Sequence, residues 1–327
     1  MAAATVGDDG RLLPNGHYGD PTVRELEERV AELLGKPSAL FTSTGVQANM
    51  IALRVWCERE DLVGVGRTSH LLRHERGAFD ERFFGLRSTP LPDDDGFPDF
   101  SGEEDISRFK LLCLENTHNA AGGVPWHPDR VTALSSERPG CPPIHLDGAR
   151  LFNAAVALDI TPAEVASAGD SVMVCLSKGL GAPVGSVLAG DEEWIQDARR
   201  VRQLLGGQMR QAGVIAAAGL FALDGLAERL KQDHERAKTL ATRLTRIPGL
   251  EVDLHVATNM VRVKVLTGPD AGRRLLTEAA TQGVLLGGPK NGELRLVTHS
   301  DISDESIDRA VTVIGDVLNL HEAPLPA

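Results

Sequence analysis

The sequence predicts an α/β protein: a large domain built on a mostly parallel mixed sheet flanked by helices, followed by a small C-terminal α+β domain. Two observations support this. Short apolar runs alternate with segments of helical periodicity, which is typical of a parallel sheet with helices on both faces. With 327 residues the chain also exceeds the size of a single core, so we expect domains over residues 1–245 and 246–327.

The first helix is expected directly after Asp20. The segment Asp20–Glu25 combines a capping aspartate, a proline in the first turn and a Thr-x-x-Glu capping box, and apolar residues recur at helical spacing until Gly35. A short strand over 39–42 then leads through Ser43-Thr44-Gly45 into a second helix. Further strands are expected at Leu62–Val65, Lys110–Leu114, Ile144–Asp147, Ser171–Leu176 and Gly185–Ala189.

The chain from residue 192 onward has a different pattern. Residues 192–244 are rich in helical periodicity, with one interruption at Gly206-Gly207, and are expected to cross from the large domain to the small one. After Gly249 we expect a strand, a helix, a second strand and a second helix, over 259–266, 270–282, 293–298 and 303–320. This order suits a compact α+β domain.

The composition excludes several classes of partner. A net charge of −12 argues against a nucleic-acid or anionic-membrane surface, and no apolar run has the length of a membrane helix. Four cysteines without metal-ligand spacing are expected to be thiols of a cytoplasmic protein, and no metal site is predicted: Cys57, Cys113, Cys141 and Cys175. The acidic turn Asp93-Asp94-Asp95 and the Pro-rich tail are expected to be solvated surface.

Two charged residues follow apolar strands and call for a partner. Asp147 ends the run Ile144-His145-Leu146, and Lys178 follows Val174-Cys175-Leu176-Ser177. Burying a neutral polar group without a hydrogen-bond partner costs about 2–7 kcal/mol, and burying an unpaired charge costs more. Pyridoxal 5′-phosphate satisfies both, because the lysine amine forms an imine with its aldehyde and the carboxylate pairs with its pyridinium nitrogen. The alternatives are a surface lysine and a helix-capping aspartate.

Further groups fit the same cofactor. Thr44-Gly45-Val46-Gln47 lies between a strand and a helix, where backbone N–H groups would hold a phosphate, although a plain tight turn has the same pattern. Arg150 would reach the phenolic oxygen of the cofactor or pair with Asp147. Arg210 and Arg295 are candidate cations for phosphate and substrate carboxylate, or ordinary surface arginines.

Two histidines follow strands that end at the same edge of the sheet. His70 would lay its ring against the pyridine, and His118 closes the run Leu114-Glu115-Asn116-Thr117. A reaction at a hydroxylated β-carbon needs a proton acceptor near that oxygen, and a neutral imidazole is suited to this role near pH 7. Each histidine alone is otherwise more often structural.

Together these residues resemble the low-specificity L-threonine aldolases, in the β-eliminating lyase group of fold-type I pyridoxal-phosphate enzymes. The resemblance covers residues 6–301. It rests on seven ordered motifs: Tyr18-Gly19-Asp20-Pro21-Thr22, Thr44-Gly45-x-Gln47-Ala48-Asn49, Leu114-Glu115-Asn116-Thr117-His118-Asn119, Asp147-Gly148-Ala149-Arg150, Cys175-Leu176-Ser177-Lys178-Gly179-Leu180-Gly181-x-Pro183-x-Gly185-Ser186, Gly206-Gly207-x-Met209-Arg210-Gln211 and Arg295-Leu296-Val297-Thr298-His299.

The resemblance implies cleavage of L-threonine, L-allo-threonine or a related L-β-hydroxy-α-amino acid to glycine and an aldehyde. It also implies a homotetramer, a dimer of dimers with shared active sites. The implied roles are Lys178 as the covalent attachment, Asp147 at the pyridine nitrogen, His70 on the ring, Arg150 at the phenolic oxygen, Gly45 and Val46 at the phosphate with Arg210 of a neighbouring subunit, His118 at the substrate hydroxyl and Arg295 at its carboxylate.

Three departures from the family pattern keep other outcomes open. The family's Ser-Asp-Thr-x-Thr segment would precede Met1, so either the start lies upstream or the carboxylate site is altered. Val46 stands where a hydroxyl residue is common, and His74 stands where an aromatic residue shapes the pocket around the β-substituent. A racemase, a β-eliminating lyase, a synthase of β-hydroxy amino acids and an inactive homologue remain alternatives.

Overall fold

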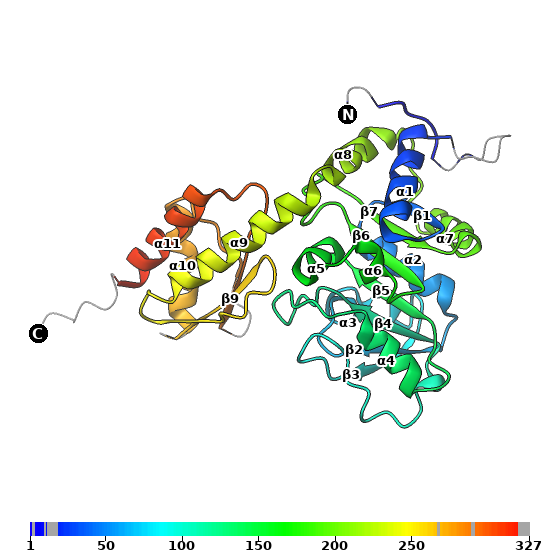
Figure 1. The fold of residues 1–327 in the computed structure, drawn as a ribbon, viewed down its shortest axis with the longest axis horizontal. Helices are drawn as coiled ribbons and strands as arrows, with labels where there is room; N and C mark the ends of the chain where they lie inside the picture. Colours follow the sequence, from blue (N-terminus) through cyan, green and yellow to red (C-terminus); the bar gives the residue numbers. More distant parts are fainter. Residues whose placement is uncertain (2–3, 10, 12–18, 267–268, 289–291, 320–327) are drawn as a thin grey trace, which may run out of the picture. The chain divides into compact units, whose positions relative to one another are not determined.

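The computed structural model describes residues 1, 4–9, 11, 19–266, 269–288 and 292–319 (Figure 1). Tyr18, the first residue of one predicted motif, and the Pro-rich tail lie outside these residues. The chain forms two compact units, Met1–Ala227 and Glu228–Ala327. The division therefore falls before residue 245, the end that the sequence analysis assigned to the first domain.

The first unit is built on a seven-stranded sheet with the order β1-β7-β6-β5-β4-β2-β3. β7 runs antiparallel to both of its neighbours, and the other neighbouring pairs are parallel. The predicted mostly parallel mixed sheet is confirmed. Its strands are β1 (Ser38–Thr42), β2 (Leu62–Gly66), β3 (Arg87–Leu91), β4 (Leu111–Glu115), β5 (Ile144–Gly148), β6 (Ser171–Cys175) and β7 (Ser186–Gly190).

Helices cover the sheet of the first unit. α1 contacts β1, β7, α6 and α8, whereas α2 contacts β6, β7 and α7. A buried cluster that includes Leu40, Ile51 and Leu188 joins α2 and α7 to the strands. The helices are α1 (Pro21–Leu34), α2 (Gly45–Trp56), α3 (His70–His74), α4 (Asp129–Glu137), α5 (Leu151–Leu158), α6 (Pro162–Ala166), α7 (Glu192–Leu204) and α8 (Gly213–Leu223). Two short 3₁₀ turns lie at Arg76–Ala78 and Ile106–Arg108.

The start of α1 follows the predicted signals with one difference. The Asp20 carboxylate accepts the backbone N–H of Val23 at 3.1 Å and Pro21 opens the first turn. The expected Thr-x-x-Glu box is not used as a cap, because the Thr22 hydroxyl donates instead to the carbonyl of Thr5 at 2.8 Å. Gly35 ends the helix with φ 61°, a left-handed conformation that glycine adopts without strain.

The second unit has an antiparallel sheet in the order β10-β9-β8. It comprises β8 (Leu250–Val252), β9 (Met260–Val265), β10 (Glu293–Val297), α9 (Leu226–Leu244), α10 (Pro269–Thr281) and α11 (Asp304–Asn319). α9 packs into this core through residues such as Ala237, Leu240 and Leu244. This packing explains why most of α9 belongs to the second unit. No helix among the described residues is long and apolar enough to cross a membrane.

Candidate active site

The parallel strands of the first unit deliver polar side chains to one edge of the sheet. Asp147 is the last residue but one of β5, and Glu115 ends β4. β2 leads to His70, and β6 leads to Lys178 within three residues. The carboxyl ends of parallel strands are where open α/β sheets bind ligands. The fold therefore brings the predicted Asp147, His70 and Lys178 to the same edge.

Asp147 is 4% exposed and is held by two donors. The Asn49 side-chain amide of α2 donates to Oδ2 at 2.9 Å, and the backbone N–H of Ala149 donates to Oδ1 at 3.1 Å. α5, the next helix, has no side-chain cap at its start. The alternative interpretation of Asp147 as a helix cap is therefore not supported, and its carboxylate faces α2 and the strand edge.

His70 is oriented by the buried carboxylate of Glu75. The His70 Nδ1 and the Glu75 Oε1 are 2.7 Å apart, and this hydrogen bond raises the pKa of His70 above its ordinary value. Asn49 also donates to Glu75, at 3.0 Å to Oε1. Ligand atoms of His70, Glu75 and Asp147 lie within 4.8 Å of one another. Burial, followed by the nearby charge of Asp147, raises the pKa of the Glu75 carboxyl, although His70 opposes this rise.

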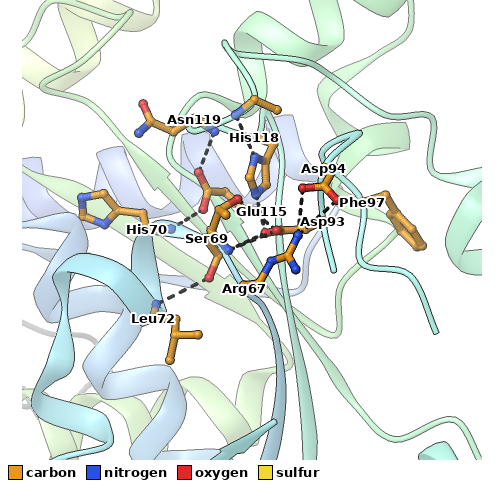
Figure 2. Close-up of polar contacts among 12 residues, drawn as sticks. Arg67, Ser69, His70, Leu72, Asp93, Asp94, Phe97, Glu115, His118 and Asn119 are labelled. Atoms are coloured by element: carbon orange, nitrogen blue, oxygen red, sulfur yellow. Dashed lines mark hydrogen bonds and ion pairs between the residues drawn. The ribbon is translucent and has the colours of Figure 1, made fainter. Parts of the chain in front are cut away.

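Glu115 holds the backbone at both histidines: it binds the N–H of His70 itself and the N–H of the residue that follows His118. Figure 2 shows its carboxylate between the backbone nitrogens of His70 and Asn119, which donate at 2.6 and 2.8 Å to separate oxygens. Burial and the charge of Asp147 raise the pKa of Glu115. Since one side chain accepts from both segments, the position of His70 is tied to that of the loop after β4.

His118 is 1% exposed and both of its ring nitrogens have partners (Figure 2). Its Nε2 lies 2.9 Å from Asp93 Oδ2, and the backbone N–H of Ala121 donates to Nδ1 at 3.2 Å. Burial alone lowers the pKa of His118, but the hydrogen bond to Asp93 and the charge of Glu115 outweigh it and raise the pKa. The Ala121 contact requires an unprotonated Nδ1, which limits that rise.

Asp93 was expected to be solvated but is 1% exposed. Besides His118, it accepts the backbone N–H and the hydroxyl of Thr68 at 2.9 Å each. Burial alone raises the pKa of this carboxyl, and these hydrogen bonds reverse the effect and lower it. Its neighbour Asp94 is exposed and pairs with Arg67 at 2.9 Å, as expected for a surface turn.

Lys178 lies half-buried in the turn that follows β6, where its carbonyl accepts the backbone N–H of Gly181 at 3.0 Å. Its charge acts on His70 and on the Cys175 thiol, lowering the pKa of each against larger effects that raise them. Arg150 acts on Cys175 in the same way. Both predicted cations therefore lie near the edge that holds Asp147.

Gly45 begins α2 directly after β1, as the phosphate-site prediction requires. Thr44 caps the helix, since its hydroxyl oxygen accepts the backbone N–H of Gln47 at 3.1 Å. A Cβ at Gly45 would lie 2.8 Å from the Cys175 sulfur, so the first turn of α2 packs closely on β6. The next residue, Val46, is exposed at this helix end.

The other predicted residues have different surroundings. Arg210 pairs with the Asp8 carboxylate of its own chain, and its loop passes α2, since a Cβ at Gly207 would meet the Gln47 side chain. His74 is exposed, with its ring centroid 5.0 Å from that of His70. Arg295 is exposed on β10 of the second unit, and its predicted role at the substrate carboxylate stays a prediction.

Several residues at this edge were not singled out by sequence: Asn49, Glu75, Asp93 and His145. Each carried a weak signal. His145 stands two residues before Asp147 in a strand and therefore shares its face. Glu75 lies on the turn of chain that follows His70, and Asn49 closes a quoted motif. No spacing rule for a single strand or helix reveals that Asn49 would reach both carboxylates.

The residues present fit pyridoxal phosphate. Three buried carboxylates, those of Glu75, Glu115 and Asp147, gather where a protonated ring nitrogen would offset negative charge. Lys178 supplies an amine near them, and the first turn of α2 supplies backbone N–H groups for a phosphate. The same edge thus combines the anion, the amine and the anion-binding helix end that this cofactor requires.

Comparisons with known proteins identify the family of the chain. The β-eliminating lyase family matches residues 1–266. The low-specificity L-threonine aldolase of Escherichia coli K12 is 39% identical over 316 residues, covering 94% of this chain and 90% of that protein. Low-specificity L-threonine aldolase 1 of Arabidopsis thaliana is 37% identical over 321 residues, covering 93% and 89%.

A solved structure supports the fold. The structure described as a putative L-allo-threonine aldolase from Listeria monocytogenes superposes with a TM-score of 0.80 at 22% identity, covering 97% of this chain and 90% of that one. The predicted fold class and the resemblance drawn from the seven motifs are both confirmed. On the family match and these identities, the chain belongs to the β-eliminating lyase family.

Proposed function

We propose that this chain is a pyridoxal-phosphate-dependent aldehyde-lyase that cleaves L-threonine, L-allo-threonine or a related L-β-hydroxy-α-amino acid to glycine and an aldehyde. The observation that carries the proposal is the placement of Asp147 and Lys178 at the carboxyl ends of the neighbouring strands β5 and β6. Membership of the family and the activities named for its relatives support the same reaction.

In this proposal Lys178 holds the cofactor aldehyde and Asp147 holds its ring nitrogen. When bound, the cofactor supplies an electron sink for the pair released as the Cα–Cβ bond breaks. Arg150 would hold the phenolic oxygen, and the N–H groups of Gly45 and Val46 would hold the phosphate. Arg295 would bind the substrate carboxylate. His74, beside His70, would line the space for the β-substituent.

We assign the proton acceptor for the substrate hydroxyl to His70 rather than His118. The His70 side chain is 33% exposed, and its Nδ1 is occupied by Glu75, which leaves the basic lone pair of a neutral ring on Nε2. His118 has partners on both nitrogens and is buried. Its role in the proposal is to position the loop after β4 near the substrate.

We also propose that the chain assembles with copies of itself and that Arg210 contacts the phosphate of a neighbouring subunit. Leu204 and Phe221 are large apolar side chains that are 84% and 77% exposed, and exposed Val46 borders the candidate phosphate site. Light scattering on the protein as it elutes from a size-exclusion column tests the self-assembly, since the mass of a monomer would contradict it. Four free thiols support a cytoplasmic location.

The test of the reaction is release of aldehyde and glycine by the purified protein with pyridoxal phosphate. Substrates are L-threonine, L-allo-threonine and L-phenylserine. Lys178→Ala should abolish release, while Lys264→Ala, at an exposed lysine of the second unit, should leave it unchanged. Formation of 2-oxobutanoate and ammonia from threonine would instead identify β-elimination. Interconversion of stereoisomers without aldehyde would identify a racemase.

A further inference from the structure

A line of hydrogen-bonded polar groups continues behind Asp147, away from the strand edge, and ends at the half-buried Trp56. Trp56 Nε1 donates to the Ser171 hydroxyl at 2.8 Å, and that hydroxyl lies 2.9 Å from His145 Nδ1. His145 Nε2 lies 3.1 Å from Asn49 Oδ1, and the Asn49 amide nitrogen donates to Asp147 at 2.9 Å. Three elements contribute to this line: α2 supplies Trp56 and Asn49, β5 supplies His145 and Asp147, and β6 supplies Ser171.

The direction of every hydrogen bond in the line is fixed. Carboxylates only accept, so the Asn49 nitrogen must face Asp147 and Glu75, and its oxygen must face His145. His145 Nε2 therefore carries the proton and donates. Nδ1 must then accept from Ser171, whose oxygen accepts from Trp56. His145 is 0% exposed, and burial lowers its pKa to about 4, consistent with a neutral ring.

A satisfied core histidine is the ordinary interpretation of such a residue. His145 differs from an ordinary core histidine because its line of hydrogen bonds ends, through Asn49, at the Asp147 carboxylate. Without the His145 proton, the Asn49 amide would lose the partner that keeps its oxygen away from Asp147. A reversed amide would place an acceptor against two buried carboxylates, and one of them would take up a proton or move.

We infer that His145 and Asn49 are positioning residues that hold the Asp147 side chain in place and aim it at the ring nitrogen of the bound cofactor. The inference rests on the proposed function for its cofactor. It requires no reaction step, because the effect is on binding: a carboxylate held at the ring nitrogen favours the bound cofactor, and a displaced carboxylate does not.

The test compares cofactor affinities by calorimetry. One ligand is pyridoxal phosphate, and the other is its carbocyclic analogue with C–H in place of the ring nitrogen. His145→Leu removes the donor to Asn49. His145→Gln places an amide nitrogen near the position of Nε2 and is the conservative control. Asn49→Leu removes the amide itself with little change in volume and serves as a second variant if His145→Leu does not fold.

We expect both leucine variants to bind pyridoxal phosphate about tenfold or more weakly, the usual effect of losing a group that orients a ligand-binding side chain. Affinity for the carbocyclic analogue should stay within about threefold, and His145→Gln should restore most of the loss. Equal weakening for both ligands, or no weakening for either, would overturn the inference. Failure of wild-type protein to bind pyridoxal phosphate would instead overturn the proposed function.

Discussion

The buried carboxylate of Glu115 accepts the backbone N–H of His70, with 2.6 Å between Oε2 and the nitrogen. Its other oxygen accepts from Asn119, one residue after His118. A carboxylate is suited to this double role because both oxygens accept. One residue at the end of β4 thereby sets the start of α3 and the loop that carries the second histidine.

Replacement of Glu115 by glutamine should disturb both segments. A glutamine amide has one acceptor and one donor, so one backbone N–H would face another donor. We expect a loss of about 1–3 kcal/mol in the free energy of unfolding, the cost of a buried polar group left without a partner. Urea unfolding measures it, with Glu104→Gln at an exposed position as the control. An unchanged midpoint would show that Glu115 does not clamp these segments.

Glu75→Gln should shift the pH dependence of turnover. The hydrogen bond to Glu75 is the largest effect that raises the pKa of His70, so its weakening should lower that pKa. If His70 acts as the base, only its neutral form accepts a proton, and the acidic limb of the kcat/KM profile should move to lower pH.

A titration of the His70 ring by NMR should move in the same direction in Glu75→Gln. Glu81→Gln, at an exposed glutamate, is the control for this comparison. A limb that stays in place while the His70 titration moves would show that another group is the base.

Asp93→Asn should reduce stability most between about pH 4 and pH 6.5, the ordinary values of aspartate and histidine. The folded-state pKa of Asp93 is lowered, so its contribution is present above its unfolded pKa and is lost as pH falls through the folded value. The pKa of His118 is raised, so its contribution is present below its unfolded pKa and is lost as pH rises through the folded value.

The expected loss within that window is roughly 3 kcal/mol, because substitution leaves a buried histidine without its charged partner. Thermal unfolding across pH measures it, and Asp94→Asn in the exposed neighbouring position is the control. If the stability difference between the wild type and Asp93→Asn stayed undiminished at high pH, His118 would be neutral in the folded protein. The pair would then be a hydrogen bond between a neutral imidazole and a carboxylate.

Much of the fold and part of the site follow from the sequence. The central strands were predicted because buried parallel strands are continuous apolar runs, whereas β3 was missed because its sequence Arg-Ser-Thr-Pro-Leu is polar and it lies at the sheet edge. Asp147 and Lys178 were found because a charge at the end of an apolar run is unusual.

The remaining residues depend on contacts between distant segments. Asn49 reaches Asp147 across 98 positions of sequence, and no local period encodes that pairing. Asp93 belongs to a run of three acids that reads as surface, and only the approach of Thr68 and His118 makes its burial favourable. Arg210 was predicted from its motif, but its pairing with Asp8 follows from where the N-terminal residues lie.

Gly45 provides a test of the close packing at the candidate phosphate site. A Cβ at this position would lie 2.8 Å from the Cys175 sulfur, while Met173 and Ser186 would be at 3.4 and 3.5 Å, which are ordinary contacts. Gly45→Ala should therefore destabilise the protein by about 1–3 kcal/mol through overpacking. Because only the sulfur is too close, Cys175→Ala should relieve the strain in the double variant.

The double-mutant cycle separates this contact from a general intolerance of alanine at Gly45. We expect the two substitutions together to cost less than the sum of the single costs, by about 1 kcal/mol or more, since the residues are in contact. Affinity for pyridoxal phosphate should follow stability, because a displaced first turn of α2 would misplace the backbone N–H groups that face the phosphate. Strictly additive costs would show that α2 can shift away from β6 without help, and that this close contact does not determine where the phosphate site lies.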